Sequence, residues 1–231
     1  MDLQYLIEHL KNEGVAQVGF SCVEDAVDER YAKYKYAVTL VYKLSDAIFD
    51  EVKEMGSPTF AYFQHYRTVN AFLDRSALWV STMIEREGFR ALPVAASQSV
   101  KDMGEYSGIF QHKTAAVKAG LGWIGKSALF VSPIYGPRVR LATVLTDMPL
   151  PELEHDELAG KKFGCAGCSV CVKKCPAMAI KGNEYVDGVS KRSDIFDARA
   201  CSEHMKAAYK NIGRGAVCGI CVASCPYGIR K

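Results

Sequence analysis

The chain has 231 residues, of which 49% are hydrophobic and 24% charged, with a net charge of +3 at pH 7. This composition is sufficient for one ordinary domain core and a second, smaller domain. The nearly balanced charge gives no electrostatic case for nucleic-acid binding, and no apolar run is long enough to span a membrane.

Apolar periodicity and turn residues predict mixed helices and strands in the first 150 residues. An amphipathic helix, not a secretory signal, opens the chain. The expected helices are 2–13, 58–88 and 112–119, and the expected strands are 15–22, 36–42, 89–96, 128–132 and 139–146. The last two strands are expected to form a hairpin through a turn at 133–137.

This order of elements predicts an α+β fold rather than a strict βαβ repeat. The acidic stretch 147–160 contains two prolines and is expected to be a linker. We therefore expect two domains, an α+β cofactor and substrate domain at 1–160 and a small cysteine-rich domain at 161–231.

The segment Gly120–Ser127, GLGWIGKS, matches both the phosphate-binding loop GxxxxGK[ST] and the dinucleotide fingerprint GxGxxG. Both motifs require a strand before the loop and a helix after it, whereas here a helix precedes and a strand follows. The helix would then direct the negative end of its dipole at a phosphate. We therefore expect no nucleotide there, and the glycines serve either as a helix stop or to let the backbone approach a flat ligand.

Eight of the nine cysteines lie between 165 and 225, in the runs CAGCSVCVKKCP (165–176) and CGICVASCP (218–226) and at Cys201 between them. The first run is C-x2-C-x2-C-x3-C-P, the spacing that holds [4Fe–4S] clusters in bacterial ferredoxins. The second run lacks a first cysteine, because Gly215 stands at that position, and Cys201 is expected to replace it. Disulfides and structural zinc fit this pattern poorly.

Two [4Fe–4S] clusters are therefore predicted, each with four thiolates. In two-cluster ferredoxins the fourth cysteine of a run ligates the other cluster. The expected ligand sets are Cys165, Cys168, Cys171 and Cys225 for one cluster, and Cys175, Cys201, Cys218 and Cys221 for the other. The remaining Cys22 follows an apolar stretch and is expected to be an inert core thiol.

The segment 112–150, which contains AGLGWIGK and YGPRVRL, resembles the epoxyqueuosine reductase family when it is read together with the two cysteine runs. It also resembles the related reductive dehalogenases. The resemblance implies a nitroreductase-like cobalamin-binding domain followed by a ferredoxin-like domain that supplies electrons to cobalt. Epoxyqueuosine reductases also carry a C-terminal helical-repeat domain that helps to hold tRNA. We expect this chain to lack that domain, which makes tRNA a doubtful partner.

The family places an aspartate acid about fourteen residues before the AGLGW glycine, where this sequence has Tyr106. Reductive dehalogenases use a tyrosine proton donor, so Tyr106 is the expected catalytic acid, assisted by Lys113 or Lys126. Glu105 and His112 are the alternatives. The expected cofactor-binding residues are His112, Lys113, Gly120, Gly122, Trp123, Gly125, Lys126, Tyr135 and Arg138. For several of these residues a purely structural role is the alternative. Arg138 and Arg140 alternate on one strand and so share a face, which is either solvated or binds an anionic ligand.

The leading hypothesis is a cytoplasmic iron–sulfur oxidoreductase, with cobalamin as a second cofactor and flavodoxin or ferredoxin as the electron donor. Its substrate is a small molecule, a corrinoid or a modified nucleoside. Two alternatives stay open: a reductase of free corrinoids or corrinoid proteins, and a non-enzymatic electron-transfer module.

Overall fold

The computed structural model describes residues 2–228, which form two compact units. The first unit contains 2–43, 68–121 and 140–159, and the second contains 44–67, 122–139 and 160–228. The second unit thus combines the cysteine-rich segment with two earlier pieces of the chain. The predicted domain division at residue 160 stays a prediction. No helix among residues 2–228 is long and apolar enough to cross a membrane.

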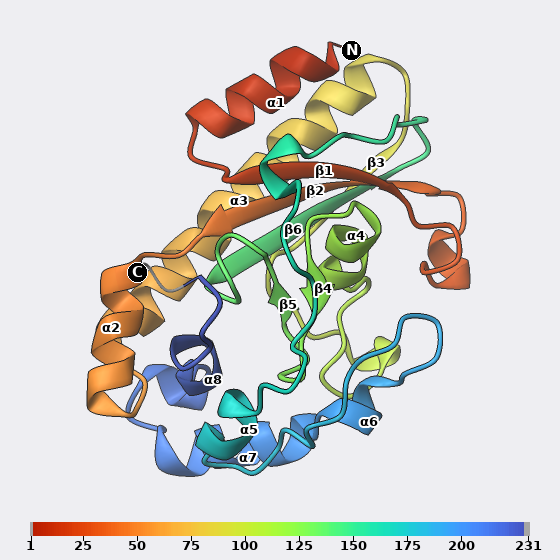
Figure 1. Ribbon diagram of the computed structural model, residues 1–231. Helices are drawn as coiled ribbons and strands as arrows, with labels where there is room; N and C mark the ends of the chain where they lie inside the picture. Colours follow the sequence, from red (N-terminus) through yellow and green to blue (C-terminus); the bar gives the residue numbers. More distant parts are fainter. Residues whose placement is uncertain (1, 229–231) are drawn as a thin grey trace. The chain divides into compact units, whose positions relative to one another are not determined.

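A four-stranded sheet forms the core of the first unit (Figure 1). The strand order is β1-β2-β6-β3, with bounds β1 Gln17–Cys22, β2 Tyr36–Lys43, β6 Val139–Thr146 and β3 Ala91–Val94. The outer pairs β1–β2 and β3–β6 are antiparallel, and Gln17 lies opposite Val41. Strand β1 has the sequence QVGFSC, in which Val18 and Phe20 alternate with polar or small residues, yet five of its six residues are buried, including the polar Gln17 and Ser21.

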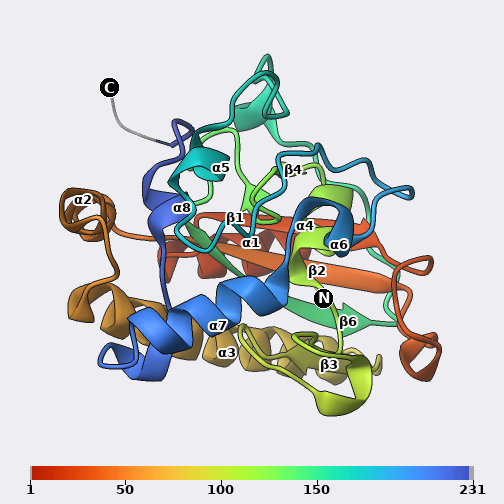
Figure 2. The same cartoon turned by 90° about the horizontal axis from the view of Figure 1, so that it is seen from below.

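Helices cover both faces of this sheet. Helix α1 (Leu3–Asn12) lies on one face and α4 (His112–Lys118) on the other, as Figures 1 and 2 show. Gly19 of β1 permits the close packing of α4, because a Cβ at this position would lie 2.7 Å from the Cβ of Ala119. Helix α3 (Phe60–Arg86) is the longest helix among the described residues, and its part from Thr68 onward belongs to this unit.

The second unit consists of short elements. They are α2 (Asp46–Met55), β4 (Trp123–Ile124), β5 (Phe130–Val131), α5 (Val170–Lys174), α6 (Arg192–Ile195), α7 (Ala198–Ala208) and α8 (Ile220–Ala223). Helix α8 packs against both α2 and α5. The described chain also has 3₁₀ turns at Glu29–Tyr31, Lys101–Met103, Asp156–Leu158 and Gly213–Gly215.

The α+β prediction is confirmed, and the predicted helices and the strands β1, β2, β3 and β6 are present. The predicted hairpin between 128–132 and 139–146 is wrong. Strand β5 pairs instead with β4, across a turn in which the Ala128 N–H donates to the Gly125 carbonyl at 2.8 Å. The bridge between Ser132 and Gly136 closes the following loop on itself, so β6 joins the other sheet.

The prediction that Cys22 is buried is also wrong. It is the last residue of β1 and is exposed, whereas the five residues before it are buried. The buried part of the strand ends one residue earlier than the sequence pattern indicates.

Candidate functional site

All eight cysteines between 165 and 225 lie in the second unit, and each is partly buried. Cys165 and Cys168 lie in the loop before α5, and Cys171 lies within that helix. Cys175 forms its C-terminal cap. The other four are Cys201 in α7, Cys218 just before α8, Cys221 within α8 and Cys225 just after it. The fold therefore brings together two cysteine runs that are fifty residues apart in sequence.

Mutual electrostatic effects divide most of these thiols into two groups. Burial, together with the charges of Cys165, Cys171 and Cys168, raises the pKa of Cys225 to about 11. Burial likewise raises the pKa of Cys201 to about 11, with contributions from Cys218 and Cys175. These neighbours follow the two ligand sets expected from the sequence.

Cys221 lies between the two groups. Its pKa is raised first by burial and then by Cys218 and Cys201, with smaller effects from Cys171 and Cys175. It also lines a pocket together with Cys165, Cys168, Cys171 and Cys225. A space bordered by five thiols is a suitable position for an iron–sulfur cluster.

Backbone N–H groups also point at several sulfurs. The Ala179 N–H donates to the Cys175 Sγ at 3.4 Å. Backbone hydrogen bonds from Val172, Ile220 and Tyr227 oppose the rise in the pKa of Cys171, Cys218 and Cys225, respectively. Such donors stabilise sulfur-centred negative charge and help to set cluster potentials. Among residues 2–228, no three His, Cys, Asp or Glu side chains are grouped closely enough to hold one metal ion. A cubane binds each thiolate at a different iron, so the thiolates need not converge in that way.

Lys126 is tied to the first cysteine loop. Its Nζ donates to the carbonyl oxygens of Ala166 at 2.8 Å and Cys168 at 3.2 Å, and it lies 3.7 Å from a carboxylate oxygen of Glu184. Only 11% of the lysine side chain is exposed. Both carbonyls belong to the segment that carries Cys165 and Cys168, so this ammonium group stabilises the shape of the loop.

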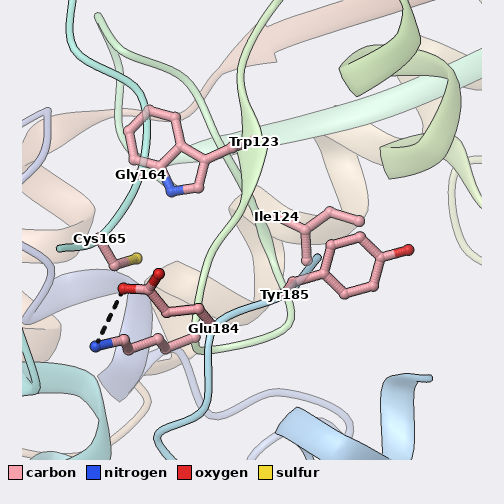
Figure 3. Close-up of a pocket in the computed structure, with 7 residues that line it drawn as sticks. Trp123, Ile124, Gly164, Cys165, Glu184 and Tyr185 are labelled. Carbon is pink, nitrogen blue, oxygen red and sulfur yellow. Dashed lines mark ion pairs between the residues drawn. The ribbon is translucent and has the colours of Figure 1, made fainter. Parts of the chain in front are cut away.

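A second cavity, of about 230 Å³, opens beside Cys165 and is also lined by Trp123, Lys126 and Glu184 (Figure 3). Trp123 is packed edge-on against Tyr227, with ring centroids 4.9 Å apart. Its buried Nε1 has no hydrogen-bond partner among the described residues. In Figure 3 this nitrogen faces Cys165. Because an unpaired buried donor is costly, the position fits a ligand or cluster that supplies an acceptor.

Arg138 and Tyr135 follow β5. The Arg138 side chain is 2% exposed, pairs with Asp46 at 3.2 Å and lies over the Phe49 ring at 5.5 Å. Its guanidinium is engaged within the unit and ties the chain just before β6 to α2. The carbonyl of Tyr135 is in close contact with Gly228, where a Cβ would lie 2.1 Å away. Arg140, where the chain returns to the first unit, donates to Asn70 at 2.9 Å and to the Ala96 carbonyl at 2.8 Å.

His112 begins α4 in the first unit. Its Nδ1 lies 2.9 Å from the Thr143 hydroxyl and its Nε2 3.0 Å from the Ala95 carbonyl. A carbonyl only accepts, so Nε2 carries the proton and the Thr143 hydroxyl donates to Nδ1. Burial lowers the pKa of His112 to about 4. This imidazole is therefore neutral at pH 7, and both nitrogens are engaged by the chain itself.

Helix α4 precedes the loop 120–127 and strand β5 follows it, as the sequence indicates, whereas strand β4 within the loop is not predicted. A Cβ at Gly122 would lie 2.2 Å from the Val131 carbonyl, and one at Gly125 would lie 2.9 Å from the Val131 side chain. Both glycines are thus needed for packing against β5. Gly120 has φ +74°, and a Cβ there would meet no atom within 4 Å, so it acts as the helix stop.

Tyr106 lies in the first unit, in a turn after the 3₁₀ segment Lys101–Met103. Its φ of 58° is in the left-handed region, which is uncommon for a residue other than glycine. Backbone strain of this kind is concentrated at functional sites. Lys113 is partly buried in the first turn of α4. The roles of both residues stay predictions.

Two features of this site are not expected from the sequence: the pairing of Lys126 with Glu184 and the unpaired indole of Trp123. Glu184 lies fifty-eight positions after Lys126, in a segment without a recognisable motif, so no local pattern could reveal the contact. The unpaired indole depends on packing against Phe163 and Tyr227, which the sequence does not show.

The comparisons with known proteins agree with this architecture. Residues 164–228 match the family model described as a 4Fe-4S double cluster binding domain. The chain is 29% identical over 151 residues to a tetrachloroethene reductive dehalogenase of Sulfurospirillum multivorans, a match that covers 65% of this chain and 28% of that protein. It is 28% identical over 165 residues to an epoxyqueuosine reductase of Listeria monocytogenes, covering 70% and 38%. The chain thus spans well under half the length of these curated relatives.

Solved structures show the same fold. An epoxyqueuosine reductase from Streptococcus thermophilus superimposes with a TM-score of 0.56 at 16% identity, covering 98% of this chain and 66% of that one. A catabolic reductive dehalogenase superimposes with a TM-score of 0.70 at 20% identity, covering 96% and 32%. The resemblance to both groups of proteins, first indicated by the motifs, is confirmed.

Proposed function

We propose that this chain, which resembles epoxyqueuosine reductases and reductive dehalogenases in sequence and fold, is an iron–sulfur reductase. The observation that carries the proposal is the gathering of eight cysteines in one compact unit that matches a double 4Fe–4S cluster domain. Electrons enter from a carrier protein such as flavodoxin or ferredoxin and pass through the two clusters to the substrate site. Thiol ligands of this kind suit the reducing conditions of the cytoplasm.

The proposed ligand sets are the two expected from the sequence, with Cys225 completing the first set and Cys201 the second. The electrostatic effects of Cys165, Cys168 and Cys171 on Cys225, and of Cys175 and Cys218 on Cys201, support this division. Cys221 is assigned to the second set, because Cys218 and Cys201 are its strongest thiol neighbours.

We further propose that the protein binds cobalamin. When bound, a cobalamin supplies a strongly reducing cobalt centre for difficult reductions. Trp123 of the second unit is proposed to help hold it, because its indole offers an unpaired N–H donor. Lys113 and Gly120 of the first unit remain candidates from the sequence, whereas the Lys126 ammonium is engaged by the cysteine loop. His112 holds the start of α4 in position through its bonds to Thr143 and Ala95, which engage both of its ring nitrogens. Tyr106 holds the proton, on its phenol oxygen, that the reduced substrate takes up.

The test is a cobalamin titration of the anaerobically purified protein, followed by EPR, and then turnover assays on two substrates. One is an epoxyqueuosine-modified tRNA stem loop and the other is 3-bromo-4-hydroxybenzoic acid, the molecules bound in two of the related structures. Stoichiometric binding with turnover of either substrate supports the proposal. Binding without turnover of either, but with reduction of free corrinoid, favours the corrinoid reductase. Intact clusters without any cobalamin binding favour the electron-transfer module.

A further inference from the structure

The segment around the first cysteine run is strongly basic. Residues 160–183 contain five lysines and neither aspartate nor glutamate, although the whole chain has a net charge of only +3. All five lysines are exposed. Two of them, Lys173 and Lys174, end α5 directly before Cys175. Exposed lysines of this kind often form only a solvated face.

An apolar residue follows them on the same segment: Met178 is 88% exposed. Its backbone has φ 50°, in the left-handed region that is unfavourable for a residue with a Cβ. The turn before it wraps Cys175: the Met178 N–H donates to the Cys175 carbonyl at 3.1 Å, and the next N–H, of Ala179, donates to the Cys175 Sγ. Internal packing does not explain why a long apolar side chain is held in water at a strained position.

The two cysteine groups also face different parts of the unit. A Cβ at Gly125 would lie 3.4 Å from the Cys165 Sγ, so the group of Cys165 lies against the 120–127 loop. Cys175, which belongs to the other group, carries the exposed turn of Met178 and follows the two lysines. If electrons leave near the 120–127 loop, they enter at the Cys175 end.

We propose that Lys173, Lys174 and Met178, here called the entry surface, form the docking site of a small acidic electron-carrier protein. The inference rests on the proposed function. The lysines attract the carrier's carboxylates and accelerate encounter, and Met178 provides an adaptable apolar contact at the centre of the interface. In each encounter the reduced carrier loses one electron and the cluster ligated by Cys175 gains it, with no bond made or broken.

The experiment measures the rate of cluster reduction in the full-length holoprotein by stopped flow, with reduced flavodoxin as the probe. Photoreduced 5-deazaflavin, a small reductant that needs no protein docking site, serves as the control. The variants are Lys173→Glu/Lys174→Glu and Met178→Gly, because glycine tolerates the left-handed backbone while removing the side chain. The charge-matched control is Lys11→Glu/Lys53→Glu, which alters two exposed lysines outside the entry surface.

The double lysine variant should be reduced by flavodoxin about tenfold more slowly at low salt, and the difference should shrink at high salt. Met178→Gly should be slower by a factor that salt changes little. Deazaflavin should reduce every variant at the wild-type rate. Equal flavodoxin rates in the wild type and both entry-surface variants would overturn the inference.

Two other outcomes would also overturn it. A charge reversal that weakens binding of a tRNA stem loop, while the flavodoxin rate is unchanged, would assign the basic surface to nucleic acid. A wild-type protein that contains little iron, or that deazaflavin cannot reduce, would refute the cluster proposal itself and the docking site with it. The iron content thus distinguishes failure of the proposed function from failure of the docking proposal.

Discussion

Replacing Lys126 with methionine should loosen one cluster and leave the other intact. The substitution keeps most of the side-chain volume but removes the donor to the Ala166 and Cys168 carbonyls. A hydrogen bond to a charged group contributes about 1.5–3 kcal/mol. Water can solvate the two carbonyls once the loop opens, so we take the combined loss as about 2–3 kcal/mol. The ion pair with Glu184 adds little, because that carboxylate is 60% exposed.

A loss of this size corresponds to opening of the Cys165–Cys168 loop that is about 30- to 150-fold more frequent. The assay is iron release to a chelator under anaerobic conditions, followed by absorbance and by EPR of the reduced protein. About half of the iron should leave Lys126→Met faster by that factor, and the other half should leave at the wild-type rate. Lys162→Met, at an exposed lysine just before the same loop, is the matched control.

Release kinetics in Lys126→Met equal to those of the wild type would refute the role assigned to this lysine. A nucleotide titration on the same proteins separates the two readings of the GKS sequence. If micromolar ATP or NAD(P)H binding is present in the wild type and lost in Lys126→Met, the ammonium binds phosphate and does not serve the cysteine loop.

Cys201→Ala should lower the iron content from about eight to about four per chain, whereas Cys22→Ser should leave it unchanged; metal analysis that finds both clusters in Cys201→Ala would show that the fourth ligand lies elsewhere. Tyr106→Phe should retain both clusters and cobalamin but lower turnover by about 10²-fold or more, the usual effect of a lost general acid; an unchanged kcat would pass the role to Glu105 or another group. Acid should destabilise the fold through His112, whose pKa burial lowers from 6.5 to about 4, because below pH 6.5 the unfolded chain takes up a proton that the folded chain does not. Between pH 7.5 and 5.5 the free energy of unfolding should fall by about 1.3 kcal/mol through this group. Denaturant titrations should detect this fall in the wild type and find it absent in His112→Asn. The same pH dependence in both proteins would contradict the role assigned to His112.

Helices α1, α3 and α4 can be predicted because each carries its own signals. Helix α1 has a capping aspartate, Asp2, whose side chain accepts from the Tyr5 N–H, and the chain leaves the helix through Gly14 at φ 102°. Helix α4 is equally clear from its apolar spacing and its stop at Gly120. The two cysteine runs are visible for a similar reason, since their spacing is local.

The pairing of strands cannot be predicted in the same way, because it depends on distant segments. The apolar strand at β5 has the same pattern whether it pairs with β4 or with β6. Two features favour pairing with β4. The turn at Gly125–Ala128 reverses the chain between the two strands, and Gly122 lets β5 approach, because any side chain there would strike the Val131 carbonyl. Helix α2 escapes prediction because its two buried residues, Phe49 and Val52, are few and flanked by charge.

The site shows the same division. Arg138 is a candidate from the sequence, but only the fold reveals that Asp46, Phe49 and the Ala223 carbonyl surround its guanidinium. Lys126 stands out through a phosphate-binding motif, and the structure directs its ammonium to the cysteine loop. In both cases the sequence identifies an important side chain, and the three-dimensional neighbours decide what it contacts.

The most direct test of the central claim is the iron and acid-labile sulfide content of anaerobically purified protein, measured together with its absorption spectrum. We predict about eight iron and eight sulfide per chain, with broad absorption near 400 nm that bleaches on reduction. Two zinc ions per chain and no absorption in that region would contradict the claim, because the eight cysteines would then hold structural metal and no electrons could pass through them.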